Sequence, residues 1–187
     1  MAVRLVALAG STRAGSLNQR LVDQAAAIAE GEGARVTRLR LADFPLPMYS
    51  AELEASAFPE EAKALKALLA SHDGFLIASP EHNGSVPVVL KNALDWASRP
   101  QGEESPIAFK AYRGKTCGLM SVSPSPFGGL RGLTHLRQIL NILQVLIPPE
   151  QVQIPFGDRA LEEGVLRDEP PVALLTALVR RVIALSR

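Results

Sequence analysis

Short apolar runs alternate with longer amphipathic stretches along the whole 187-residue chain. Apolar runs that end in Gly, Pro or Ser are typical of buried strands, and apolar residues repeated every three or four positions are typical of helices. Strands that alternate with helices pack as a parallel sheet with helices on both faces. The predicted strands are Val3–Ala9, Arg35–Leu41, Gly74–Ser79, Thr116–Val122 and Gln151–Pro155. The predicted helices are Leu17–Glu30, Pro59–Ser71, Val86–Ala97, Leu130–Leu146 and Pro170–Leu185.

The short strands favour an α/β, three-layer, flavodoxin-like fold with a five-stranded parallel sheet of order 2-1-3-4-5, over a six-stranded dinucleotide fold. Residues 48–59 and 98–114 are predicted to be loops. Because no repeat, low-complexity tract or linker interrupts the pattern, we expect a single domain over residues 1–187. In such sheets ligands bind beyond the carboxyl ends of the strands, so the loops after strands one, three and four are the candidate site.

Composition excludes several classes of protein. A net charge of +1 lacks the basic excess of a nucleic-acid-binding protein, and 47% hydrophobic residues exclude intrinsic disorder. No apolar run approaches the roughly 20 residues that span a bilayer. The segment Met1–Arg4 lacks the features of a signal peptide, and the lone Cys117 cannot form an internal disulfide. We therefore expect a cytoplasmic protein that binds neither nucleic acid nor membrane.

The segment from Gly10 to Asn18 leaves the first strand and enters the first helix, where N–H groups and the helix dipole favour an anion. Thr12 replaces the second glycine of a G-x-G-x-x-G loop, and Ser16 replaces the lysine of a P-loop. Hydroxyls and one guanidinium remain, which suits a terminal phosphate. These side chains belong to Ser11, Thr12, Ser16 and Arg13. The alternative is a tight turn in which Ser16 only caps the helix.

The loop after the third strand contains Pro80 and Pro87, which stiffen it, and Asn83-Gly84, which tolerate left-handed backbone conformations. Together with the first loop, this segment carries a family resemblance. The chain resembles the NADPH-dependent FMN reductase family, which includes bacterial quinone, azo-dye and chromate reductases. The matching motifs are Gly10-Ser11-Thr12-Arg13 with Ser16, Pro80-Glu81-His82-Asn83, Leu90-Lys91-Asn92-Ala93-Leu94-Asp95-Trp96, Gly128-Gly129-Leu130-Arg131 and His135-Leu136-Arg137-Gln138-Ile139-Leu140.

The resemblance implies a bound FMN, with NADPH or NADH as the electron donor and a small acceptor such as a quinone. The FMN phosphate would lie on the first loop and the isoalloxazine ring against the second, with the loop Ser121–Ser125 on the other side of the ring. Members of the family commonly carry tyrosine where this chain has His82. The predicted cofactor contacts are Ser11, Arg13, Ser16, Leu17, Asn18, Pro80, Glu81, His82, Asn83, Gly84, Ser121 and Ser123.

Hydride transfer between a nicotinamide and a flavin needs alignment rather than an acid–base triad, so we predict no catalytic side chain. His82 is either a contact or gate at the ring or an exposed turn residue. No metal is predicted, because the three histidines lie far apart in the sequence and no C-x-x-C motif occurs. The two ring-side loops contain no Phe, Tyr or Trp, so we expect one open ring face, which favours turnover over electron storage.

Three other side chains allow two interpretations each. Glu81 is either a general acid or, by default, a solvent-facing loop residue. Arg131 either steers an NADPH phosphate or lies at a subunit contact. Cys117, within a predicted strand, is expected to be a buried and unreactive thiol rather than a nucleophile.

Apolar residues nearly encircle the predicted helix Leu130–Leu146. A helix at the surface of one subunit needs a polar outer side, so this pattern favours a homodimer or homotetramer with Arg131 and Arg137 near the interface. The alternative is burial of the helix under the connection Ser98–Gly114.

The sequence therefore favours an FMN-dependent oxidoreductase that reduces a small acceptor such as a quinone in ping-pong fashion. One alternative is a flavin reductase that releases reduced FMN to a partner monooxygenase. Another is a non-enzymatic electron carrier like flavodoxin, although such carriers are usually strongly acidic and this chain carries +1. A flavin-free structural protein leaves the donor-rich first loop unexplained.

Overall fold

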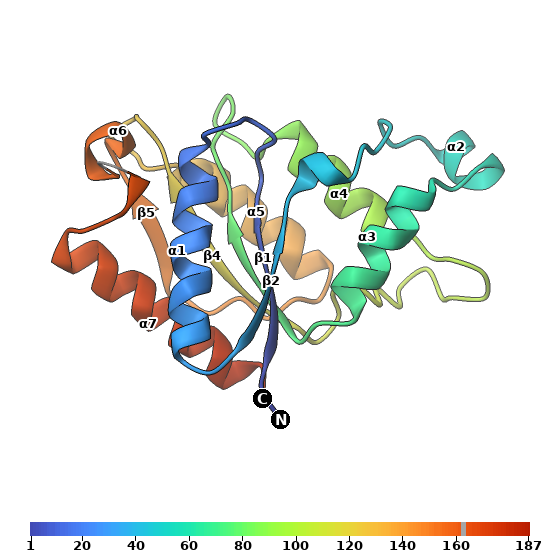
Figure 1. Cartoon of the computed structure of the whole chain (residues 1–187). Helices are drawn as coiled ribbons and strands as arrows, with labels where there is room; N and C mark the ends of the chain where they lie inside the picture. Colours follow the sequence, from blue (N-terminus) through green and yellow to red (C-terminus); the bar gives the residue numbers. More distant parts are fainter. Residues whose placement is uncertain (162–163) are drawn as a thin grey trace.

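Five parallel strands form one sheet at the centre of the molecule, in the order β2-β1-β3-β4-β5 (Figure 1). The computed structural model describes residues 1–161 and 164–187. This order confirms the flavodoxin-like prediction. The strands are β1 (Arg4–Ala9), β2 (Arg35–Leu39), β3 (Gly74–Ala78), β4 (Thr116–Val122) and β5 (Gln151–Ile154).

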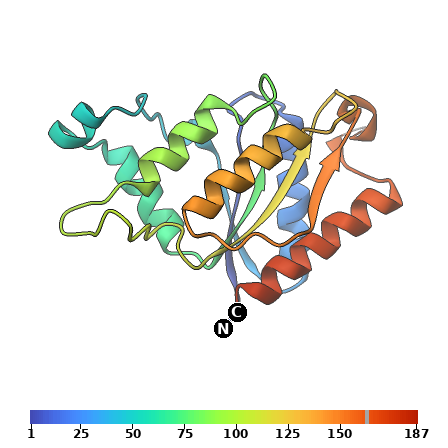
Figure 2. The same ribbon diagram turned by 180° about the vertical axis from the view of Figure 1, so that it is seen from behind.

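Helices cover both faces of the sheet. Side chains of α1 and α7 pack on one face, and those of α3, α4 and α5 pack on the other. Figures 1 and 2 show the two layers from opposite sides. The helices are α1 (Leu17–Gly31), α2 (Ala51–Ser56), α3 (Glu60–Ala70), α4 (Val88–Ser98), α5 (Leu130–Ile142), α6 (Gly157–Ala160) and α7 (Glu169–Leu185), with a 3-10 turn η1 (Leu41–Asp43). None of the helices in the described parts of the chain is long and apolar enough to cross a membrane.

Strand β1 shows how the sequence fills both cores. Successive side chains of a strand point to opposite faces, so Leu5 and Ala7 face α1 and α7, while Val6 and Leu8 face the other layer. All four are at most 4% exposed. Because both faces of the central strands are covered, these strands read in the sequence as continuous apolar runs.

Helix α5 ends earlier than predicted, at Ile142. Gln144 adopts a left-handed conformation with φ of 63°, which stops the helix. The following segment is extended: the Leu146 N–H donates to the Lys115 carbonyl over 2.8 Å, and the Cys117 N–H donates to the Leu146 carbonyl over 2.9 Å. The prediction of a helix to Leu146 was therefore wrong, because part of the apolar set that nearly encircles the predicted helix lies in this extended segment. The outer side of α5 is largely polar, with exposed Arg131, Thr134, His135, Gln138 and Asn141.

The predicted loop 48–59 contains the short helix α2, which the sequence pattern did not predict. Its N-cap is Ser50, whose hydroxyl accepts a hydrogen bond from the Leu53 N–H over 3.0 Å. No residue of α2 is buried, so the helix has no apolar stripe to mark it in the sequence. Ser98 is the last residue of α4, and residues 99–114 contain turns but neither helix nor strand, as predicted for this connection.

Candidate active site

A cleft of about 570 Å³ opens at the carboxyl edge of the sheet, between the loops that follow β1, β3 and β4. Its volume lies within the roughly 300–1,000 Å³ typical of small-molecule sites. The neighbouring strands β1 and β3 send their chains into α1 and α4 on opposite faces, which is where such sheets bind ligands. The lining residues are Gly10, Ser11, Thr12, Arg13, Ser16, Leu17, Asn18, Pro80, Glu81, His82, Val89, Val122, Ser123, Pro124 and Asp158.

Each of the three loops is fixed at its start by the neighbouring strand. The Gly10 N–H donates to the Ala78 carbonyl over 2.8 Å, and the Ser79 N–H donates to the Met120 carbonyl over 2.9 Å. The Ser123 N–H donates to the Ile154 carbonyl over 3.1 Å. The sheet ladder therefore continues into the loops and holds them side by side.

The first loop presents donors to the cleft. Ser16 caps α1 by accepting the Gln19 N–H over 3.4 Å, so the capping role expected of this residue is present. Arg13 is exposed, and its guanidinium forms no ion pair or hydrogen bond with any described residue. The Ser11 hydroxyl lies at the same end of the cleft and accepts the Arg13 N–H over 3.3 Å. An uncommitted cation, hydroxyls and the positive end of α1 suit an anionic group.

Asn18 has a structural task that the sequence did not reveal. Its side-chain amide donates to the Val122 carbonyl over 2.9 Å, and its side-chain oxygen accepts the Val122 N–H over 3.1 Å. The residue is only 4% exposed. Asn18 therefore ties the first turn of α1 to the end of β4 and brings two of the three loops together.

The second loop ends in a tight turn. His82 and Ser85 exchange two backbone hydrogen bonds of 2.9 and 3.0 Å. Between them, Asn83 and Gly84 both have positive φ, 50° and 76°, which is the pattern of an Asn-Gly hairpin turn. Pro80, Glu81 and His82 line the cleft, whereas Asn83 and Gly84 lie at the turn beyond it.

Glu81 is not the solvent-facing residue expected by default, because its side chain is only 7% exposed. Its carboxylate accepts Arg131 Nε over 2.8 Å and the Gly132 N–H over 3.0 Å. Burial opposes the charged form, but these hydrogen bonds outweigh it and hold the pKa of Glu81 below its ordinary value. The ionised form of Glu81 is therefore favoured, which argues against the general-acid interpretation. Arg131, for which two roles were open, pairs within its own chain.

The third loop contributes Ser123 but not Ser121. Ser121 is fully buried, and a Cβ atom placed on Gly129 would lie 2.0 Å from its hydroxyl oxygen. The hydroxyl thus lies behind the loop rather than in the cleft, and no described group forms a hydrogen bond with it. Asp158 in α6 lines the cleft and was missed in the sequence, although the loop after β5 also starts at the carboxyl edge.

His82 and His135 both lie beside Ser85, whereas His72 and Cys117 lie elsewhere in the fold. His82 is exposed at the cleft, while His72 lies 2.8 Å from the Thr37 hydroxyl on the outer side of the sheet. Burial raises the pKa of the Cys117 thiol far above its usual range, as expected for an inert strand cysteine. In residues 1–161 and 164–187, no group of three His, Cys, Asp or Glu side chains is placed to hold a metal ion.

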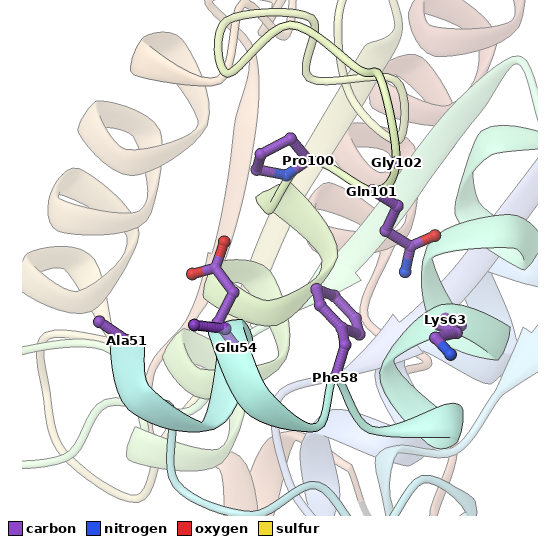
Figure 3. A pocket seen from close by; sticks show the side chains of 8 residues that line it. Ala51, Glu54, Phe58, Lys63, Pro100, Gln101 and Gly102 are labelled. Carbon is purple, nitrogen blue, oxygen red and sulfur yellow. The ribbon is translucent and has the colours of Figure 1, made fainter.

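A second hollow, of about 360 Å³, lies between α2, α3 and the segment 100–102 (Figure 3). Phe58 and Gln101 face each other across it. The Glu54 carboxylate at its edge already accepts the Tyr49 hydroxyl over 2.7 Å and Arg99 Nε over 2.8 Å. This hollow has no strand-to-helix loop that could bind a phosphate, so the cleft at the sheet edge is the better candidate site.

Comparison with known proteins agrees with this geometry. The family model described as NADPH-dependent FMN reductase matches residues 3–159. A 2-hydroxy-1,4-benzoquinone reductase of a Burkholderia species is 36% identical over 148 residues, which cover 79% of this chain and 75% of the relative. An NAD(P)H-dependent FMN reductase of Pseudomonas aeruginosa is 33% identical over 171 residues, covering 89% and 86%.

Among solved structures, the flavoenzyme NAD(P)H:(acceptor) oxidoreductase FerB from Paracoccus denitrificans superposes with a TM-score of 0.80 and 28% identity, covering 99% of this chain and 97% of that one. The family match spans the strands β1 to β5 and all three loops that form the cleft. The chain therefore belongs to the NADPH-dependent FMN reductase family.

Proposed function

We propose that this protein is an FMN-dependent oxidoreductase that takes hydride from NAD(P)H and reduces a small acceptor such as a quinone. The observation that carries the proposal is the cleft at the carboxyl edge, where an uncommitted Arg13 and the start of α1 lie opposite the Pro80–His82 loop. The relatives named as quinone and FMN reductases support the same chemistry.

The described residues fit an FMN. The hydroxyls of Ser11 and Thr12, the Arg13 guanidinium and the first-turn N–H groups of Leu17 and Asn18 supply donors for its phosphate. We assign the main chain of Asn18 to this task, because its side chain is engaged by Val122. Ser16 contributes as the helix cap that directs the N–H groups toward the cleft.

The second and third loops supply the surfaces for the ring. We propose that the backbone of Pro80–His82, which lines the cleft, bonds to its polar edge and that Ser123 and Pro124 lie across the cleft from it. Bound FMN would supply the hydride-transfer chemistry that links the nicotinamide to the acceptor. The chain's own residues bind and orient the reactants, and none of them is assigned a proton-transfer role.

The cleft offers no aromatic side chain that would cover the face of the ring. Its lining includes no Phe, Tyr or Trp, and the exposed His82 is the largest ring system beside it. An uncovered face is what a nicotinamide or quinone needs for stacking. This supports an enzyme over an electron carrier, as does the net charge of +1.

An absorbance spectrum before and after anaerobic addition of NADPH, and separately of NADH, tests the proposal. We expect a yellow protein, or one that quenches the fluorescence of added FMN, whose visible bands bleach on reduction and return on addition of a quinone. Retention of FMN through gel filtration supports the tight-cofactor form, and loss of FMN supports release to a partner monooxygenase. A protein that neither carries nor binds flavin would refute the assignment.

We further propose a cytoplasmic homodimer or homotetramer, since NAD(P)H is available in that compartment. Support for assembly comes from exposed apolar side chains at the cleft end of two neighbouring helices. Val88 on α4 is 63% exposed, Leu130 on α5 is 44% exposed, and Phe127 just before α5 is 58% exposed. Such residues are typical of surfaces that a partner covers.

A further inference from the structure

The second loop is bonded to α5 on both sides of its turn. Before the turn, Glu81 accepts Arg131 Nε over 2.8 Å and the Gly132 N–H over 3.0 Å. At its end, the Ser85 hydroxyl lies 2.9 Å from His135 Nδ1. Arg131 and His135 are four residues apart and so share one side of α5. One helix side therefore holds both ends of the segment that turns at Asn83-Gly84.

The backbone of α5 also approaches the loop closely. A Cβ atom placed on Gly132 would lie 3.2 Å from the Ser85 carbonyl oxygen and 3.3 Å from Glu81 Cβ. A side chain at Gly132 would therefore press on the loop, while the Gly132 N–H donates to the Glu81 carboxylate over 3.0 Å. The backbone of α5 at Gly132 is thus closely packed against the loop at Glu81 and Ser85.

The turn needs such support, because two successive residues have left-handed backbone conformations. Asn83 has φ of 50°, and this left-handed conformation is higher in energy for a residue with a side chain than for a glycine such as Gly84. Pro80 and His82 are the sequence neighbours of Glu81, and both of them line the cleft. A shift of Glu81 therefore moves the wall of the cleft.

Charge makes Glu81 dependent on Arg131. The Glu81 side chain is 7% exposed, whereas that of Arg131 is 58% exposed. Loss of Arg131 leaves the buried carboxylate with the Gly132 N–H but removes its counter-charge. A buried charge without a counter-charge is strongly disfavoured, so this loss drives Glu81 toward solvent. Arg131 itself does not line the cleft. It therefore acts on the cleft through Glu81 and through its contact with Gly84 in the turn.

We propose that Arg131 is a positioning residue, which holds the Pro80–Ser85 loop in its flavin-binding conformation by neutralising Glu81, with His135 as a second attachment at Ser85. This inference rests on the proposed function for the identity of the ligand. That Arg131 holds the Pro80–Ser85 loop in place applies to the flavin-free protein as well, and it is tested in that form.

The first test is an FMN titration, followed by fluorescence quenching, of wild type, Arg131→Ala, Glu81→Gln and the double variant. We expect Arg131→Ala to weaken FMN binding about tenfold, on the scale measured for coupled neighbours. The double variant should bind more tightly than Arg131→Ala, because a neutral amide needs no counter-charge. Arg180→Ala is the matched control, since Arg180 forms a similar exposed ion pair with Glu32, 2.8 Å long, away from the cleft.

The second test needs no flavin. Amide hydrogen exchange of residues 80–85 in the flavin-free protein should be faster in Arg131→Ala than in wild type and unchanged in Arg180→Ala. The milder variant Arg131→Lys, which keeps the charge, should exchange more slowly than Arg131→Ala and so controls for a general loss of folding.

The outcomes are distinct. Equal exchange of residues 80–85 in wild type and Arg131→Ala would overturn the inference. So would a double variant, Arg131→Ala with Glu81→Gln, whose fold-loss of FMN affinity equals the product of the losses in the two single variants. If no variant and not even wild type binds FMN, the proposed function fails, and the exchange experiment still decides whether Arg131 holds the loop.

Discussion

At the scale of single residues, Arg13 is the side chain on which the phosphate assignment depends most. It lines the cleft beside the start of α1 and has no ion pair with a described residue. Arg13→Ala should weaken FMN binding by roughly 1.5–3 kcal/mol, the range for a lost hydrogen bond to a charged group. A fluorescence titration measures this, with Arg35→Ala at the opposite edge of the sheet as control. Unchanged FMN affinity in Arg13→Ala would place the phosphate elsewhere.

Asp158 should act in the opposite direction. It is an exposed carboxylate that lines the same cleft, and a phosphate dianion bound there is repelled by it. Asp158→Asn should therefore tighten FMN binding a few-fold, with the gain shrinking as salt screens the charge. Asp43→Asn, outside the cleft, controls for the change in net charge. Weaker binding by Asp158→Asn would mean that Asp158 supports the loop instead of opposing the ligand.

Which residues gather at the site was predictable, and how they are oriented was not. The carboxyl-edge rule identifies the loops after β1, β3 and β4 from the sequence. Nothing local shows that Glu81 is buried, because its partner Arg131 lies 50 residues away in the sequence. In the sequence Ser121 is likewise a candidate hydrogen-bond donor to the ligand. In the structure its hydroxyl is buried against the backbone of Gly129. Orientation depends on contacts between distant segments, which a sequence pattern does not contain.

At the scale of elements, the fully buried ones were the most predictable. Strands β3 and β4 have only buried residues, so each appears as an apolar run with clear ends. Helix α2 lacks any buried residue and left no such trace. The end of α5 was misjudged because apolar residues continue beyond Ile142 in an extended segment that pairs with Lys115. A run of apolar residues indicates that a segment is buried. Only the spacing of the apolar residues along the sequence indicates whether the segment is a helix or a strand.

The connection 98–114 depends on one buried lysine for its attachment to α3. Lys66 is 5% exposed in its side chain, donates to the Arg99 carbonyl over 2.7 Å and pairs with Glu104. Lys66→Met should lower the free energy of unfolding by about 1–3 kcal/mol, because the Arg99 carbonyl and Glu104 each lose a partner. It should also speed proteolysis within residues 98–114.

Lys63→Met is a matched control on the same helix. Lys63 pairs with Glu60 at the surface, and such pairs contribute about 0–1 kcal/mol. Denaturant unfolding of both variants separates the two cases. Equal stability of Lys66→Met and Lys63→Met would show that the connection is held by its apolar contacts, among them Tyr112, instead of by Lys66.

At the scale of the whole molecule, the placement of aromatic residues fits the proposed turnover. Only 5% of residues are aromatic, and several of them pack far from the cleft. Tyr49 and Phe58 contact Trp96 edge-on at centroid distances of 5.1 and 5.3 Å, and Phe75 packs against Tyr112. The aromatic side chains thus stabilise the layer of α2 to α4 and leave the cleft without aromatic walls. The sequence predicted that the two ring-side loops lack aromatic residues, and the fold shows that these aromatic side chains pack in the helical layer instead.

The exposed apolar side chains at the cleft end of α4 and α5 lead to a prediction about assembly. These two helices lie side by side on one face of the sheet (Figure 2), so a second copy placed there would bury Val88, Phe127 and Leu130 beside the cleft. Light scattering at micromolar concentration should give the mass of a dimer or tetramer. Val88→Asp should shift the mass toward the monomer, because it buries a charge in the contact while the start of α4 tolerates an acid. Leu174→Asp on α7, on the opposite face, should leave the mass unchanged, and a monomeric wild type would contradict the assembly altogether.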